Sequence, residues 1–561
     1  MLGFVLLVAS FLAIDVAQAD GRPHLNMIRP PGMPLMSDSQ PLGPVTSRNG
    51  TVLPPFNQTY WFDQLIDHNN PSRGTFKQRF WHTWQFYEPG GPVLLMTPGE
   101  VNADGYADSY LSTKAISGQI AQQQNGSVVI IEHRFYGLSN PINDLKAESL
   151  KYHTIQQAIE DLEYFIKNVI LPQPDGDKLT PDKAPWVLFG GSYSGALTSW
   201  TMVNKPDLFA AGYASSAVVE AILNFWRYFE PIREHMPANC SADVQVAISH
   251  VDEVFSGDNK TAIQEMKDLF GLGEMTHLDD VAGALRNNLW DWQSLQPTSQ
   301  NSLFYEFCDA LEVKDGVSAS AEGWGLEHAL QAWGNFWTEG GYLQRLCRNN
   351  SPEACLGTYD PNQPFYTDTS IDNNLRSWMW IVCNEVGYLQ EGAPKGHSSL
   401  VTRLVQPPYD LRQCQLMFPE AFEKPPKVDI KGTNKAYKGW DVRIENIFFA
   451  NGMRDPWREA TMSAEGLDVK STPEQPIGLG DGFHCSDLST ASGLADPTIL
   501  AVQQAALASM KIWLADWKPS AAHDGARVPA PASGSGRKPE GRTKPAPRKP
   551  LSAWSKGAGV A

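Results

Sequence analysis

The sequence predicts an α/β fold in which a doubly wound, mostly parallel sheet is interrupted by a long, largely helical insertion. Three observations carry this prediction. Short apolar runs of buried-strand type occur at 93–97, 128–131 and 186–189. Apolar residues at helical spacing over 155–169 separate the second run from the third. The strand pattern then stops, and Trp-rich helical segments fill 220–435 before a strand returns at 443–450.

The remaining segments follow from composition. Residues 1–14 form an apolar run that is too short to span a membrane, and Ala17-Gln18-Ala19 supplies a cleavage site, so 1–19 is predicted to be a signal peptide. A Pro/Gly/Ser-rich stretch, 20–58, is an extended, propeptide-like lead-in. The sheet domain is expected in two parts, 59–219 and 436–518, around the 220–435 cap. The basic Pro/Ala/Gly-rich tail, 519–561, is predicted to be disordered and offers no membrane anchor.

A secreted protein would pass through an oxidising compartment, and two features fit that route. Six N-x-S/T sequons are candidate glycosylation sites: Asn49, Asn57, Asn125, Asn239, Asn259 and Asn349. The seven cysteines suggest three disulfides and one free thiol. No Cys-x-x-Cys pair is present, which argues against a zinc or thioredoxin-type site. The acyl-transfer mechanism predicted below needs no metal or cofactor. A vacuolar or lysosomal lumen is the alternative location.

The net charge disfavours nucleic acid as a partner. The chain carries −17 overall, but the segment from 519 onward holds eight Lys/Arg against two acids, so the rest of the chain is at −23. Such an acidic body suits a secreted protein that works in acidic surroundings. Oligomeric state cannot be predicted from the sequence.

The 186–202 stretch predicts a nucleophile elbow. A strand ends in Gly190-Gly191-Ser192-Tyr193-Ser194-Gly195, and a helix follows directly. This strand–turn–helix lifts a serine hydroxyl above a sheet and leaves a backbone N–H behind it for an oxyanion. The final glycine stands one place later than in Gly-x-Ser-x-Gly, so a Gly/Ser-rich loop after a buried strand is the competing interpretation.

A serine nucleophile needs a base and a carboxylate, which α/β-hydrolases place in the order Ser, Asp, His on loops after late strands. Asp455 follows the predicted 443–450 strand, and His484 lies in a Gly-flanked loop before the last helix. Taken singly, Asp455 could be a turn residue and His484 a surface imidazole. Their order, placement and glycine context together favour a triad.

The chain resembles the family of prolyl carboxypeptidase and its lysosomal dipeptidyl-peptidase relative, which includes secreted fungal acid prolyl endopeptidases. The resemblance covers most of 60–517 and rests on four motifs: Glu132-His133-Arg134-Phe135-Tyr136-Gly137, Gly190–Gly195, Asn451-Gly452-Met453-Arg454-Asp455-Pro456-Trp457 and Gly482-Phe483-His484-Cys485-Ser486-Asp487-Leu488. It implies an α/β-hydrolase fold with a helical cap. It also implies Ser192 as nucleophile, Asp455 as orienting acid and His484 as base. The oxyanion donor would be the Tyr193 N–H, helped by Gly99 in the 98–100 loop.

The same resemblance implies a Cys383–Cys414 disulfide. Cys347–Cys355 would close a short loop that contains Pro352, and Cys240–Cys308 then remains by elimination, which leaves Cys485 free.

Three residues are candidates for substrate selection. Trp457 could form an aromatic wall for a prolyl ring, or could simply be core. Glu100 could bind a free substrate amine, although a solvated loop acid is slightly preferred. Ala196 stands where mammalian members have a larger apolar residue.

These features predict a secreted serine peptidase that cleaves proline-containing peptides or proteins on the carboxyl side of proline, through an acyl-enzyme. A secreted esterase or lipase and a non-catalytic hydrolase-fold binding protein are the alternatives. Endopeptidase, carboxypeptidase and dipeptidyl-peptidase modes stay open. An optimum below neutral pH is expected from the resemblance, and it would require a lowered His484 pKa, for which burial under the cap is one route.

Overall fold

The structure is a computed structural model that describes residues 26–36, 43–299 and 302–519. The predicted signal peptide and all but the first residue of the predicted tail lie outside these ranges.

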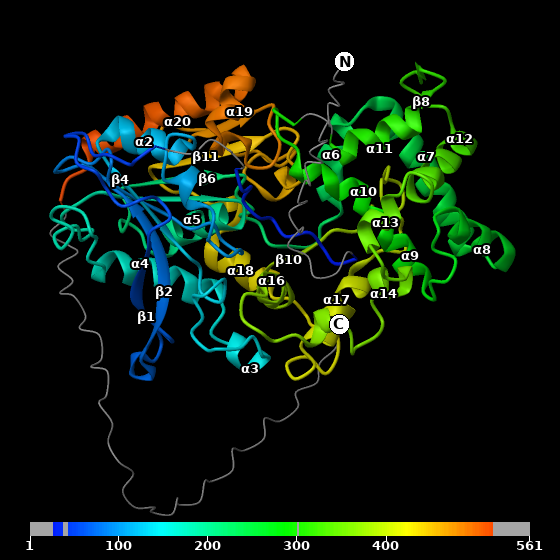
Figure 1. Cartoon of the computed structure of the whole chain (residues 1–561), viewed down its shortest axis with the longest axis horizontal. Helices are drawn as coiled ribbons and strands as arrows, with labels where there is room; N and C mark the ends of the chain where they lie inside the picture. The colour runs from blue at the N-terminus through cyan, green and yellow to red at the C-terminus, as the bar shows by residue number, and fades with distance from the viewer. Residues whose placement is uncertain (1–25, 37–42, 300–301, 520–561) are drawn as a thin grey trace, which may run out of the picture.

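An eight-stranded sheet forms the centre of the molecule (Figure 1). Its order is β1-β2-β4-β3-β5-β6-β11-β12, and only the contacts of β2 with β1 and β4 are antiparallel. The strands are β1 Thr59–Leu65, β2 Thr75–Thr83, β3 Val93–Met96, β4 Ser127–Ile131, β5 Trp186–Gly191, β6 Ala211–Ser215, β11 Ile447–Gly452 and β12 Ile477–Gly480. This order, with a strand–turn–helix elbow after β5, is the α/β-hydrolase fold, as the sequence predicted.

Helices cover both faces of this sheet, as a mostly parallel sheet requires. In β3, Leu94 and Met96 join the core that includes α2 (Ile116–Gln124) and α20 (Pro497–Asp516). Val93 and Leu95, the alternate residues, join the core of α4 (Ile155–Asn168) and α5 (Tyr193–Asn204). In Figure 1, α2, α19 (Thr490–Ala495) and α20 lie along one side of the sheet, and α4 lies on the other.

The cap lies between β6 and β11 and is largely helical, as predicted. Figure 1 shows most of its helices beside the sheet rather than over its faces. They are α6 Glu230–His235, α7 Ala238–Ser256, α8 Lys260–Leu269, α9 Leu278–Ala284, α10 Arg286–Trp290, α11 Leu303–Glu312, α12 Leu326–Trp337, α13 Tyr342–Cys347, α14 Pro352–Leu356, α15 Pro364–Thr367, α16 Asn374–Ile381, α17 Pro407–Met417 and α18 Ile430–Tyr437. Two short strands, β7 (Ile222–Asn224) and β10 (Gly387–Leu389), pair in parallel.

Three disulfides tie the cap together, and their pairing confirms the prediction. Cys240–Cys308 joins α7 to α11, Cys347–Cys355 joins α13 to α14, and Cys383–Cys414 reaches α17. Cys485 is free and buried.

One sequence expectation needs correction. The 443–450 strand begins only at Ile447 and runs on to Gly452, because Asn446 adopts a left-handed conformation (φ 62°) that an extended strand cannot contain. In addition, α20 is long and apolar enough to cross a membrane by length and composition, the one such helix among the residues that the structure describes. One face of α20 packs into the core, through Ile499, Val502, Gln503, Ala506, Met510 and Trp513.

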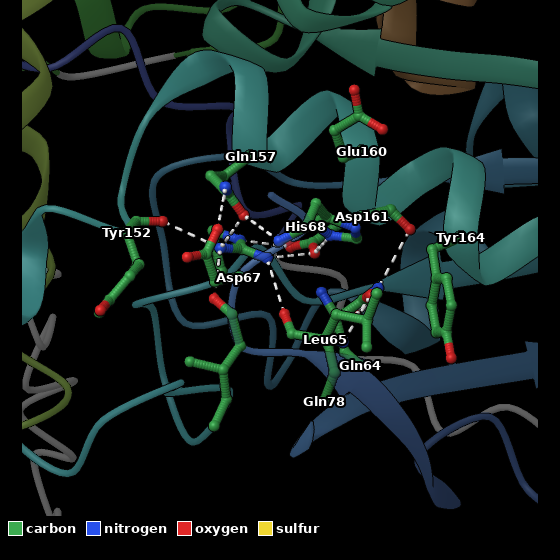
Figure 2. A network of polar contacts seen from close by, with 12 residues as sticks. Gln64, Leu65, Asp67, His68, Gln78, Tyr152, Gln157, Glu160, Asp161 and Tyr164 are labelled. Carbon is green, nitrogen blue, oxygen red and sulfur yellow. Dashed lines mark hydrogen bonds and ion pairs between the residues drawn. The ribbon is translucent and has the colours of Figure 1, made fainter. Parts of the chain in front are cut away.

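A buried arginine in the 132–137 motif holds the edge of the sheet in place. Arg134 pairs with Asp161 of α4 and donates to the carbonyls of Leu65 (3.1 Å) and Tyr152 (2.9 Å). His68 also contacts Asp161, at 2.7 Å (Figure 2). The paired guanidinium outweighs burial and lowers the pKa of Asp161. This motif residue therefore joins β1, the loop after β4 and α4.

Glu132, the acid of the same 132–137 motif, contacts the loop that lies against the elbow. Glu132 accepts hydrogen bonds from Arg79 (2.9 Å), Ser139 (2.6 Å) and the backbone N–H of Ala103 (3.0 Å). It thereby fixes the loop after β3, which carries Gly99 and Glu100.

One buried carboxyl in the cap yields a pH-dependent stability prediction. Glu391 is fully buried, its carboxyl oxygens have no hydrogen-bond partner, and burial raises its pKa to about 10, aided by Asp410 and opposed by Arg286. The unfolded chain ionises this group near pH 4.3, so the folded state binds the extra proton above that pH, and stability falls as pH rises. Glu391→Gln cannot ionise. Its free energy of unfolding, compared with that of the wild type, should therefore increase by up to about 3 kcal/mol between pH 4.5 and pH 7.

Melting temperatures of both proteins at the two pH values would measure this gain. Glu423→Gln, at an exposed position, serves as the matched control and should show no such change. An equal difference between Glu391→Gln and wild type at both pH values would contradict the prediction.

Candidate active site

The elbow after β5 holds Ser192 in a strained backbone conformation, with φ 62° and ψ −126°. A non-glycine residue keeps such a conformation only where its surroundings impose it. Here the Ser192 N–H donates to the Ser215 carbonyl of β6 at 2.8 Å. The next turn packs so closely that a Cβ on Gly190 would stand 2.1 Å from the Ser194 carbonyl oxygen. The sequence therefore needs glycine at this position to close the turn.

The structure brings Ser192, His484 and Asp455 into one hydrogen-bonded line. His484 Nε2 lies 2.7 Å from Ser192 Oγ, and His484 Nδ1 lies 2.8 Å from Asp455 Oδ1. The same carboxylate oxygen accepts from the Trp457 N–H at 2.9 Å. All three side chains of the line are almost fully buried, at 0%, 2% and 0% exposure.

The loops that carry Asp455 and His484 are bound to each other and to the sheet. The N–H groups of Met453 and Arg454 donate to the carbonyls of Gly480 and Gly482, and the Arg454 side chain pairs with Asp481. On the other side, the Cys485 N–H donates to Ser216 Oγ at 3.0 Å, just beyond β6. Asp455 and His484 are thus positioned by backbone contacts at the carboxyl ends of neighbouring strands.

Burial and charge act in opposite directions on His484. Burial alone would lower its pKa, but the Asp455 carboxylate and its hydrogen bond outweigh burial, and the pKa is raised well above 6.5. The lowered pKa that an acidic optimum would require is therefore absent. Desolvation under the cap does lower the pKa of His484, but the paired Asp455 carboxylate raises it by more.

The Tyr193 N–H, the predicted oxyanion donor, faces an acceptor from the N-terminal segment. It donates to the Pro31 carbonyl at 3.4 Å. Gly99 lies against the elbow in a positive-φ conformation (φ 85°), and a Cβ there would stand 3.3 Å from that of Ser194. Its N–H, however, donates to Thr97 Oγ1 at 3.3 Å, so the predicted second donor is engaged elsewhere in this structure.

Ser194, the neighbouring hydroxyl, is already used within the elbow. Its Oγ donates to the Gly191 carbonyl at 2.7 Å and accepts from the Gly191 N–H at 3.1 Å. Neither ring nitrogen of His484 bonds it, so the geometry favours Ser192 as the nucleophile.

The three substrate-selection candidates have different environments. Trp457 is fully buried, with its ring centroid 5.4 Å from that of Tyr388 and 6.4 Å from that of His484. Glu100 is buried, its carboxyl oxygens have no hydrogen-bond partner, and burial raises its pKa well above the usual range. It is not the solvated acid preferred from the sequence. Ala196 is buried in the first turn of α5.

Sequence reasoning missed two residues of the cap that reach the site. Gln293 accepts from Trp457 Nε1 and the Tyr228 hydroxyl, both at 2.9 Å, and donates to the Pro30 carbonyl at 3.0 Å. Gln390, directly after β10, bonds the backbone of Arg29. No residue pattern marks either glutamine, because each acquires its role only when the cap folds back onto the elbow.

Of the predicted glycosylation sites, Asn49, Asn57, Asn259 and Asn349 are exposed, whereas Asn125 and Asn239 are half-buried. Within the described ranges, no group of three or more His, Cys, Asp or Glu residues could hold a metal ion.

The fold and this site define a hydrolase-type α/β protein with a serine on a strained elbow. The model of the family described as "Serine carboxypeptidase S28" matches residues 64–507, and the chain belongs to that family of serine peptidases. A protein named "Serine protease vicPa" from Bipolaris victoriae is 34% identical over 81% of this chain and 88% of its own length. A "Probable extracellular serine carboxypeptidase" from Arthroderma benhamiae is 33% identical over 73% of this chain and 59% of its own length.

Among solved structures, an acetylester hydrolase from Corynebacterium glutamicum aligns with 81% of this chain and 95% of its own, at 11% identity and a TM-score of 0.31. The fold assignment rests instead on the strand order and the elbow.

The free thiol beside His484 gives a direct test of the packing here. Cys485 is fully buried, and burial raises the pKa of its thiol. Because the thiolate is the reactive form, a thiol-specific reagent should not modify the native protein but should titrate one thiol after denaturation without reductant. Rapid modification of the native protein, or no thiol after denaturation, would contradict this packing and pairing.

Proposed function

We propose that this protein is a secreted serine peptidase that cleaves peptides on the carboxyl side of proline through an acyl-enzyme. The observation that carries the proposal is the hydrogen-bonded line from Asp455 through His484 to Ser192. Secretion is supported by the predicted signal peptide and by the word "extracellular" in the name of the Arthroderma relative.

In this mechanism Ser192 Oγ attacks the substrate carbonyl carbon, and His484 Nε2 takes its proton and passes it to the leaving amine. Asp455 holds His484 in the tautomer that carries hydrogen on Nδ1, and it stabilises the imidazolium. The Tyr193 N–H stabilises the oxyanion. Water, activated by His484, then hydrolyses the acyl-enzyme.

Two observations support a preference for proline. The Trp457 ring, among Phe225, Tyr228 and Tyr388, provides a flat apolar surface close to His484 that suits a rigid prolyl ring. In addition, the carbonyl that accepts from the Tyr193 N–H belongs to a proline, Pro31. Membership of a peptidase family disfavours the esterase alternative, and the intact line disfavours a non-catalytic binding protein.

Replacing the nucleophile should abolish turnover and spare the fold. Ser192→Ala removes the attacking hydroxyl, and the expected loss is about 10⁶ in kcat, the size found in subtilisin. A serine-directed phosphonate should label the wild type and not this variant, while both secrete and melt alike. Ser194→Ala, two residues further along the elbow, is the matched control and should keep its phosphonate labelling. The nucleophile would be Ser194 if the two variants exchanged behaviours.

The pH dependence follows from the raised His484 pKa. A base must be unprotonated to act, so kcat/KM should rise with pH through a pKa above 6.5 and be low at pH 5. Profiles on prolyl and alanyl versions of one peptide would show this limb and report the proline preference together. An optimum near pH 5 would contradict the assigned electrostatics of His484. Equal hydrolysis of the two peptides at every pH would remove the proline preference and leave a serine peptidase.

A further inference from the structure

The N-terminal segment Asn26–Met36 runs through the space above the elbow. In Figure 1 this dark-blue segment extends from the sheet to the cap helices. Residues 26–29 are buried, as are Pro31 and Met33, although the segment contains no helix or strand. A Pro-rich stretch this buried is more than a lead-in, because its backbone polar groups must find partners within the protein.

The residues before Pro31 are held as a peptide ligand would be. Gln390 binds both backbone groups of Arg29: its Oε1 accepts from the N–H at 3.0 Å, and its Nε2 donates to the carbonyl at 2.8 Å. Gln293 donates to the Pro30 carbonyl at 3.0 Å. These contacts involve only main-chain atoms of the segment, so another peptide could make them.

The Pro31 carbonyl itself lies at the predicted oxyanion donor. It accepts from the N–H of Tyr193, the residue directly after Ser192, at 3.4 Å. That N–H is the group that the elbow directs at an oxyanion. The bond that follows this carbonyl is Pro31–Gly32, so the residue on its acyl side is proline.

The residues after Gly32 are also bound. The hydroxyls of Tyr106 and Tyr110 donate to the carbonyls of Met33 (2.9 Å) and Pro34 (2.8 Å). The Met33 sulfur lies 3.3 Å from Ser194 Oγ, against the elbow. The chain therefore passes across the site, with bound residues on both sides of the Pro31–Gly32 bond.

We infer that Asn26–Met36 occupies the substrate cleft as an intramolecular inhibitor, and that Pro31–Gly32 is the bond at which the protein processes itself. This inference rests on the proposed function, since it uses Ser192 as nucleophile. The seated segment also accounts for the burial of Ser192, His484 and Asp455, because the segment and the cap together close the cleft.

The processing step is an ordinary acyl transfer. Ser192 Oγ bonds to the Pro31 carbonyl carbon, the bond to the Gly32 nitrogen breaks, and His484 delivers the serine proton to that nitrogen. One water then hydrolyses the acyl-enzyme. The products are a carboxylate at Pro31 and a new amino terminus at Gly32.

The cleavage is tested by intact mass and N-terminal sequencing of the full secreted chain. Purified wild type should accumulate a species that begins at Gly32, and Ser192→Ala should keep residues 26–31. Pro31→Ala keeps the backbone carbonyl but loses the proline, so it should stay intact at least about tenfold longer. A wild-type chain that stays uncut at Pro31–Gly32, or a Ser192→Ala chain that is cut there, would overturn self-processing.

The inhibition is tested by the rate of phosphonate labelling in chains that cut themselves slowly, before they are processed. Pro31→Ala should label slowly, because the segment remains seated. Pro31→Glu places a charge in a buried position, displaces the segment and should label at least about tenfold faster. Pro44→Glu in the Pro31→Ala background, at an exposed position on the same N-terminal stretch, is the control and should label as slowly as Pro31→Ala does. Equal rates for Pro31→Ala and Pro31→Glu would overturn inhibition.

Two further measurements separate failure of this inference from failure of the proposed function. If Pro31→Glu does not fold, Arg29→Ala in the Pro31→Ala background loosens the segment instead, by removing the hydrogen bonds of Arg29 to Trp290 and Ser294. Hydrogen exchange of 26–36 in Ser192→Ala shows whether the segment is seated, whatever the activity. Protected amides without phosphonate labelling of any variant would refute Ser192 as nucleophile. Unprotected amides with normal labelling would refute only the inhibitory segment.

Discussion

The hydrogen-bonded line from Asp455 to Ser192 depends on a constraint that the whole sheet must satisfy. Its members stand 292 and 29 residues apart in the chain, yet their polar atoms meet within 2.8 Å. Parallel strands make this possible, because the carboxyl ends of β5, β11 and β12 open at one edge of the sheet. A shift of any one strand by a residue would reverse its side chains and separate the line.

The cap determines how that line behaves as an electrostatic system. By excluding water it strengthens the interaction of each charge near Ser192 with its neighbours, and it also raises the cost of leaving a charge unpaired. Burial raises the pKa of Glu100, whose carboxyl oxygens have no partner, whereas the pairing with Asp455 raises the pKa of His484 despite burial. Burial therefore does not set the sign of a pKa shift by itself. The partner does, and that partner comes from a different loop.

Much of this architecture could be predicted, for identifiable reasons. Apolar runs such as Val128–Ile131 show buried strands because both faces of a parallel sheet are covered. The glycines around Ser192 show the elbow because no other residue fits that close a turn. The predicted strand start at Arg443 was wrong, since Ile444 stands between polar residues as in a strand while the left-handed Asn446 turns the backbone before β11. Gln293 and Gln390 were not found, because a glutamine has no distinctive spacing.

The sequence by itself determined the fold class, the elbow and the residues Ser192, Asp455 and His484, because local chemistry and chain order mark each of them. The three disulfide pairs followed from the family resemblance, which implied Cys383–Cys414 and left the others to a short loop and to elimination. Only the tertiary structure decided what surrounds that line. It raised rather than lowered the pKa of His484, buried Glu100 and raised the pKa of its carboxyl, and seated Pro31 against the Tyr193 N–H. These outcomes depend on contacts between segments hundreds of residues apart, and no local pattern records which segment will supply the neighbouring charge or carbonyl.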